Sequence, residues 1–159
     1  MQARSNLFAS PVVARSMRHF ASASRVIIND STVPSRTRDL MMLRASQING
    51  CGFCTDAHSK DAVHAGEDQV RINLVATWRE STVFTEAERA ALELTEEGTR
   101  IADAAGGVPD DVWARAAEHY DADQLAAMVA IIALINASNR MGVITRQAGG
   151  GHEPGSPLG

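Results

Sequence analysis

Both cysteines of the chain lie in one short segment, INGCGFCTDAHSKDA, at residues 48–62. Cys51 and Cys54 are three residues apart, and His58 follows the second cysteine by four residues. On a helix with 3.6 residues per turn, these three side chains fall within about 60° of one another. The spacing therefore predicts two thiols and an imidazole on one helical face.

Such a group favours redox chemistry. The unpaired N–H groups and the dipole at a helix start stabilise a thiolate, and a neighbouring imidazole can take the proton of a thiol. A thiolate attacks peroxides and disulfides. Attack on a peroxide gives a sulfenic acid, which a second cysteine three residues away can convert to a disulfide. We therefore favour a redox-active dithiol.

Two other interpretations stay open on the residues alone. The C-x-x-C-x-x-x-H pattern supplies three zinc ligands, although no second C-x-x-C or H-x-x-x-H follows to complete a tetrahedral site. The cysteines could also be two small, inert core residues, but such a pair would not need the adjacent histidine.

The elements that must position these residues are predicted to be helices, because strand signals are almost absent from the chain. Helix-start chemistry recurs along the sequence. The predicted starts are Ser10-Pro11, Pro34, Cys51, Thr85-x-x-Glu88, Pro109 and Asp121-x-x-Gln124. Asn49-Gly50 and Gly66 end the two helices around the cysteines. We expect an all-α fold of six or seven helices.

The chain of 159 residues fits one domain. We expect an N-terminal extension at residues 1–9, a helical domain at 10–148 and a disordered tail at 149–159, because GGGHEPGSPLG is rich in glycine and proline. Residues 1–29 hold no acidic residue, which is typical of a transit peptide. The alternative is a first helix of the domain that begins at Ser10-Pro11. We favour the helix and a cytoplasmic location.

The composition limits the classes of partner that we expect for this chain. The net charge of −4 gives no reason to expect a nucleic acid or an acidic membrane surface as partner. The longest apolar run, residues 125–135, is shorter than the roughly twenty residues that cross a bilayer. We expect Glu93, Glu96 and Glu97 to form a solvated helix face and His152 to lie at the surface.

The segment LRASQINGCGFCTDAHSKDA (residues 43–62) resembles the core motif of AhpD-like alkylhydroperoxidases, within the carboxymuconolactone decarboxylase superfamily. Residues 77–96 and 132–143 resemble later segments of its peroxidase-related members, so the likeness covers about residues 10–146. It implies an all-helical fold that assembles as homo-oligomers, commonly trimers or hexamers.

The resemblance also implies catalytic roles. Cys54 would attack the peroxide, Cys51 would resolve the product, and His58 would share a proton relay with a carboxylate twelve residues before Cys51. That carboxylate is Asp39 here, where the family has the longer glutamate. Phe53 replaces a histidine of the best-known peroxidase and makes the pocket more apolar.

We therefore expect a cysteine-dependent alkyl hydroperoxide reductase that needs no cofactor or metal. Its partners would be an organic hydroperoxide or disulfide substrate and a thiol reductant. The alternatives are a metal-binding or non-catalytic helical oligomer on the same scaffold, or the decarboxylase activity, whose members typically lack the C-x-x-C pair.

Overall fold

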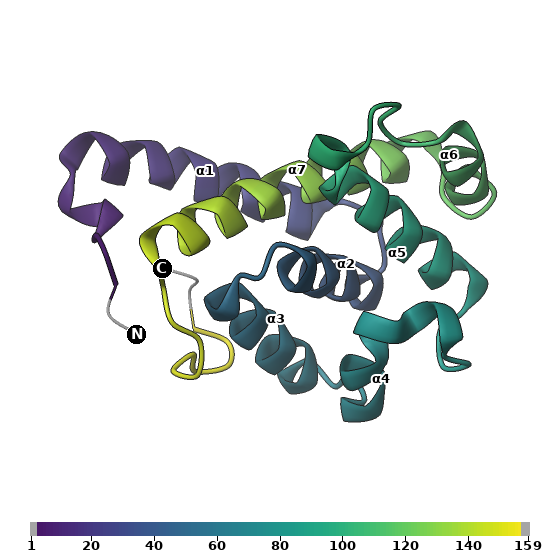
Figure 1. Cartoon of the computed structure of the whole chain (residues 1–159), viewed down its shortest axis with the longest axis horizontal. Coiled ribbons are helices and arrows are strands. Elements are labelled where there is room, and N and C mark those ends of the chain that lie inside the picture. Colours follow the sequence, from purple (N-terminus) through teal and green to yellow (C-terminus); the bar gives the residue numbers. More distant parts are fainter. Residues whose placement is uncertain (1–2, 157–159) are drawn as a thin grey trace.

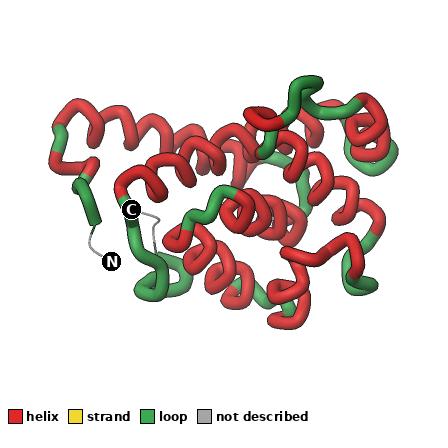
Figure 2. The backbone as a smooth tube through the Cα atoms, in the orientation of Figure 1, coloured by secondary structure: helices red, strands yellow, loops and turns green. Residues whose placement is uncertain are grey.

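The computed structural model describes residues 3–156, and this part of the chain holds seven α-helices and no strand (Figures 1 and 2). The helices are α1 (Pro11–Asp30), α2 (Ser35–Ile48), α3 (Gly52–His64), α4 (Gln69–Leu74), α5 (Glu86–Thr99), α6 (Asp110–Ala117) and α7 (Ala122–Thr145). Short 3-10 helices are η1 (Leu7–Ala9), η2 (Val75–Glu80) and η3 (Ile101–Asp103). The expected all-α fold is confirmed.

The predicted helix starts have the expected hydrogen bonds. The Ser10 hydroxyl accepts from the amide of Val13 at the start of α1. Thr85 with Glu88, and Asp121 with Gln124, form reciprocal capping boxes at the starts of α5 and α7. Each cap satisfies backbone donors that a helix start leaves without partners, which fixes where these helices begin.

Helix α2 is the centre of the fold and packs against α3, α5 and α7 (Figure 1). Its residue Met41 joins an apolar cluster with α5, α6 and α7, while Leu40 and Leu43 join a second cluster with η2 and α5. Because α2 contributes to both clusters, this helix, which leads into the cysteine segment, is held on two sides.

Helix α1 lies along α7 at the edge of the molecule (Figure 1). None of its residues is fully buried, and Val12 and Val26 are more than half exposed. By length and composition alone, helix α7 could cross a membrane. Core helices of soluble proteins also pass this test. It packs against α1, α2, α3, α5 and α6.

The prediction that Glu96 lies on a solvated helix face is wrong. Glu96 is only 1% exposed and pairs with Arg44, Arg79 and Arg100, while the indole N–H of Trp78 donates to it. These hydrogen bonds and charges lower the pKa of Glu96 to about 2, against the opposing effect of burial. The carboxylate is therefore a charged crosslink between α2, η2 and α5.

Candidate active site

The turn between α2 and α3 places the first cysteine. Gly50 has φ +66°, a conformation that glycine adopts without strain, and it directs the chain from α2 into α3. The amide of Cys51 then donates to the carbonyl of Ser46. Cys51 is the N-cap of α3, and its sulfur accepts from the amide of Cys54 at 3.3 Å. The sequence therefore holds both sulfurs at the first turn of a helix.

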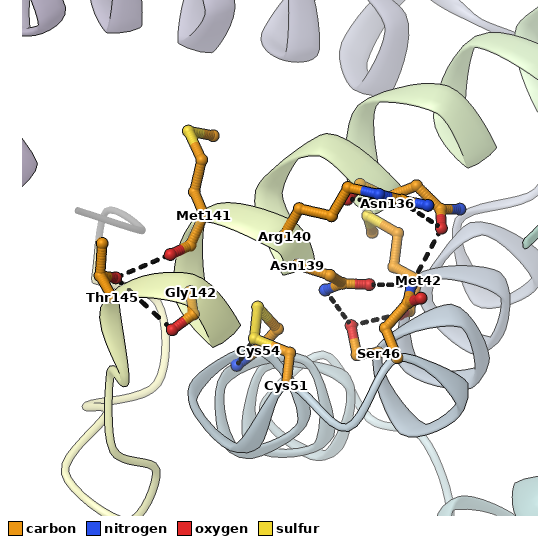
Figure 3. Close-up of a disulfide and its surroundings, with 11 residues drawn as sticks. Met42, Ser46, Cys51, Cys54, Asn136, Asn139, Arg140, Met141, Gly142 and Thr145 are labelled. Carbon is orange, nitrogen blue, oxygen red and sulfur yellow. Dashed lines mark hydrogen bonds between the residues drawn. A yellow bond between two sulfur atoms is a disulfide. The ribbon is translucent and has the colours of Figure 1, made fainter.

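Cys51 and Cys54 are joined by a disulfide, with their Cα atoms 5.3 Å apart (Figure 3). The two residues are 1% and 6% exposed. Only Cys54 lines the main cavity of the structure, while Cys51 lies behind it, against α7. A molecule in the cavity can therefore approach the sulfur of Cys54.

Helix α7 closes over the disulfide at Gly142 (Figure 3). A methyl group on Gly142 would lie 2.9 Å from the sulfur of Cys51 and 3.6 Å from that of Cys54. The first of these distances is shorter than ordinary van der Waals contact. Glycine is therefore what allows α7 to pack directly on the redox pair.

A buried amide network holds α2 and α7 together beside the disulfide (Figure 3). The side-chain NH2 of Asn49 donates to the side-chain oxygens of Asn136 and Asn139, both at 2.9 Å. Asn139, which is fully buried, donates to the hydroxyl of Ser46 at 3.0 Å. Because buried polar groups without partners are costly, this network specifies the register between the two helices.

The main cavity has a volume of about 700 Å³ and lies between α1, α2, α3 and α7. Most of its wall is apolar, with Met17 and Phe20 from α1, Leu134 and Met141 from α7, and Phe53. A polar group at the α3 side interrupts that wall and consists of Asp39, Cys54, His58 and Asp61. The cavity thus joins an apolar chamber to a sulfur and the side chains of Asp39, His58 and Asp61, and Arg25 of α1 also lines it.

His58 lies one helical turn after Cys54 and is 8% exposed. Burial lowers its pKa to about 4, while the charge of Asp61 acts in the opposite direction and His152 lowers it further. The imidazole is therefore neutral near pH 7 and able to accept a proton. Among the described residues, no hydrogen bond joins its ring to Cys54 or to Asp39.

Asp39 reaches the same cavity from α2. Burial raises its pKa to about 6, the charge of Arg38 lowers it, and the charges of Asp61 and Glu67 raise it. A carboxyl group with this pKa changes its protonation state close to neutral pH, which suits a group that passes protons.

Three of the four predicted site residues, Cys54, His58 and Asp39, thus line the same cavity, and Cys51 is bonded to Cys54 behind it. Two further residues near this site, Asp61 and His152, were not predicted from the sequence. Asp61 lines the cavity, and His152, expected at the surface, is 8% exposed and bonded to Asp61. Within residues 3–156, no group of three or more histidine, cysteine or acidic side chains is arranged to hold a metal ion.

Comparison with known proteins identifies relatives of this chain and of its fold. The model of the carboxymuconolactone decarboxylase family matches residues 11–97. The uncharacterized protein YdfG of Bacillus subtilis is 42% identical over 113 residues, which are 71% of this chain and 76% of that protein.

Two solved structures share the fold. A protein of unknown function from Agrobacterium tumefaciens, named as a candidate antioxidant defence protein AhpD, is 34% identical with a TM-score of 0.86, over 95% of this chain and 100% of that one. The debrominase Bmp8, bound to 2,3,4-tribromopyrrole, is 20% identical with a TM-score of 0.75, over 87% of this chain and 71% of that one. The second likeness concerns the fold alone.

The raised pKa of Asp39 predicts a pH-dependent stability. Between its ordinary pKa of 3.8 and about 6, the folded protein binds more protons at this carboxyl than the unfolded chain does. Stability therefore falls as the pH rises through this window. Asp39→Asn removes this proton binding. The free energy of unfolding of the variant, relative to that of the natural protein, should therefore rise by about 1–2 kcal/mol between ~pH 4 and ~pH 8, a range that allows for the partial exposure of Asp39.

Urea unfolding of the oxidised protein at both pH values measures this gain, and Asp30→Asn, at an exposed carboxylate, is the control. A stability difference between Asp39→Asn and the natural protein that is the same at both pH values would contradict the assignment.

Gly142→Ala tests the packing of α7 on the disulfide. Alanine favours a helix over glycine by roughly 1 kcal/mol, but here its methyl group meets the Cys51 sulfur. We expect the oxidised variant to be less stable than the natural protein by about 1–3 kcal/mol. Gly52→Ala is the matched control, since its methyl group would meet its nearest neighbour at 3.7 Å. Urea denaturation at neutral pH measures both, and a stabilised Gly142→Ala would show that the contact is not tight.

Proposed function

Because the chain belongs to the carboxymuconolactone decarboxylase family, we propose that it is a cysteine-dependent hydroperoxidase of the AhpD-like type, which reduces organic hydroperoxides through Cys51 and Cys54. One observation carries the proposal. The disulfide presents the sulfur of Cys54 to a largely apolar cavity in which a neutral imidazole also lies.

The proposed cycle starts from the reduced dithiol. Cys54 lies in the first turn of α3, where unpaired backbone N–H groups and the helix dipole favour a thiolate. His58, one turn further along the cavity wall, is the base that takes the thiol proton. Asp39, which lines the same cavity from α2, is the second proton carrier of the relay.

The Cys54 thiolate attacks the terminal oxygen of the hydroperoxide. An S–O bond forms, the O–O bond breaks, and the alkoxide leaves as an alcohol with the proton held by His58. The product is the sulfenic acid of Cys54. The thiol of Cys51 attacks the sulfur of this sulfenic acid, loses its proton, and the hydroxyl group leaves as water. This step gives a bond between Cys51 and Cys54, the same pair that is bonded in the structure.

Two thiols of a reductant then restore the dithiol by thiol–disulfide exchange and become a disulfide themselves. In total, one hydroperoxide and two thiols give one alcohol, one water and one disulfide. Because only Cys54 faces the cavity, it is also the sulfur that the reductant thiol would attack.

The apolar wall supports an organic substrate rather than hydrogen peroxide. The cavity of about 700 Å³ has room for an alkyl or aryl group beside Met17, Phe20 and Leu134. Burial of that group would contribute about 25 cal/mol for each square ångström of apolar surface. Hydrogen peroxide has no such surface to bury.

The other proposed partners are a thiol reductant and further copies of the chain, as a trimer or hexamer. Exposed apolar side chains on α1 and α7, Val12, Val26 and Ile144, support self-association. We place the cycle in the cytoplasm, where thiol reductants are abundant.

Single cysteine variants test the division of roles. Cys54→Ser should lose hydroperoxide reduction with a dithiol reductant entirely, because serine cannot form the sulfenic acid. Cys51→Ser should consume one equivalent of cumene hydroperoxide and keep a sulfenic acid on Cys54, detectable by mass spectrometry after trapping with a carbon nucleophile. Unchanged turnover by Cys54→Ser would contradict the proposal. A sulfenic acid trapped on Cys51 in Cys54→Ser, with none on Cys54 in Cys51→Ser, would reverse the roles of the two cysteines.

A further inference from the structure

The C-terminal loop, residues 149–156, lies against α3 through specific hydrogen bonds, whereas its composition predicts disorder. The carboxylate of Asp56 accepts from the amides of Gly150, at 2.7 Å, and His152, at 3.1 Å. The ammonium of Lys60 donates to the carbonyls of the same two residues and pairs with Asp56. Two side chains one turn apart on α3 thus hold the backbone of the loop.

The loop also reaches the cavity wall through Asp61. One carboxylate oxygen of Asp61 lies 2.9 Å from the ring nitrogen Nε2 of His152 and accepts from the amide of Gly155 at 2.8 Å. The side chain of His152 is only 4% exposed. A buried imidazole from the end of the chain is therefore directed at a carboxylate of α3.

Asp61 shares its helix face with the reacting residues. Cys54, His58 and Asp61 occupy positions i, i+4 and i+7 of α3, and all three line the main cavity. When His58 takes the proton of Cys54 it becomes a buried cation, which is costly without a nearby negative charge. Asp61 is the carboxylate on the same face, one turn beyond His58.

We propose that Asp61 and His152 act as one positioning unit for His58, so that the C-terminal loop completes the proton relay of the site. The inference rests on the proposed function. Asp61 stabilises the imidazolium of His58 through its charge, and His152 and Gly155 fix the orientation of Asp61.

Other charged groups lie around this unit. Arg38 and Asp39 face it from α2, and Arg25 of α1 lines the same cavity. Asp56, Lys60 and His64 lie on α3, and Glu67 follows the end of α3. The carboxylate of Asp39 already has the positive charge of Arg38 beside it, which offsets its own charge. Asp56 and Lys60 neutralise each other in an ion pair of 2.8 Å, and Glu67 is paired with Arg71. Asp61 is thus the carboxylate best suited to this role.

The experiment compares Asp61→Asn, His152→Gln and the double variant with two controls. Glu153→Gln changes an exposed side chain of the same loop, and His119→Gln replaces an exposed histidine elsewhere. His152→Gln keeps the backbone bonds of the loop to Asp56, so it separates the role of the ring from that of the loop. The readout is the rate constant of Cys54 oxidation by cumene hydroperoxide against pH, measured in the reduced protein with the C-terminal loop present.

We expect both single variants to oxidise about tenfold more slowly at neutral pH, since general acid–base catalysis is partly lost. The pH midpoint of the rate should move upward in Asp61→Asn, because the thiolate–imidazolium pair forms less readily without the charge of Asp61. The double variant should be no slower than Asp61→Asn, as expected for residues that act together.

Rates and midpoints of His152→Gln and Asp61→Asn equal to those of Glu153→Gln would overturn the inference. Losses that multiply in the double variant would also overturn it. So would a lower rate of Asp61→Asn with an unchanged pH midpoint, since a purely structural effect gives that result. These outcomes leave the proposed function intact as long as Cys54→Ser abolishes peroxide reduction in the same assay.

Discussion

The contact between α7 and the first turn of α3 is the constraint on which the site depends. Gly142 lets the backbone of α7 pass directly over the disulfide, and the amide network of Asn49 and Asn139 fixes the height of α7 relative to α2. A side chain at Gly142 would push α7 away from the sulfurs. Because α7 also forms one wall of the main cavity, the same contact sets both the burial of Cys51 and the shape of the space before Cys54.

The unequal surroundings of the two sulfurs explain how one dithiol can divide its work. Cys51 caps α3 with its side chain and faces α7, whereas Cys54 faces the cavity and the imidazole of His58. The buried carboxylates around them serve different purposes. Glu96 is a fully paired crosslink between helices, while Asp39 lines the cavity with a pKa near neutrality. The first contributes to the fold, and the second is available to chemistry.

Local sequence signals predicted much of this structure. Capping residues such as Ser10 and Thr85 located helix starts, and the C-x-x-C-x-x-x-H spacing placed Cys54 and His58 on one face of α3. Contacts between distant segments could not be predicted in this way. Glu96 meets Arg44 across 52 positions and His152 meets Asp61 across 91, so neither partner is visible in a helical pattern. A composition rich in glycine and proline likewise gives no sign of the hydrogen bonds between the C-terminal loop and side chains of α3.

The central claim is that Cys51 and Cys54 form a working dithiol that an organic hydroperoxide oxidises. A count of free thiols in the reduced protein, before and after one equivalent of cumene hydroperoxide, tests it most directly. The account predicts a fall from two free thiols per chain to none, with mass spectrometry locating the bond between Cys51 and Cys54. Two thiols remaining after the hydroperoxide is added would contradict it.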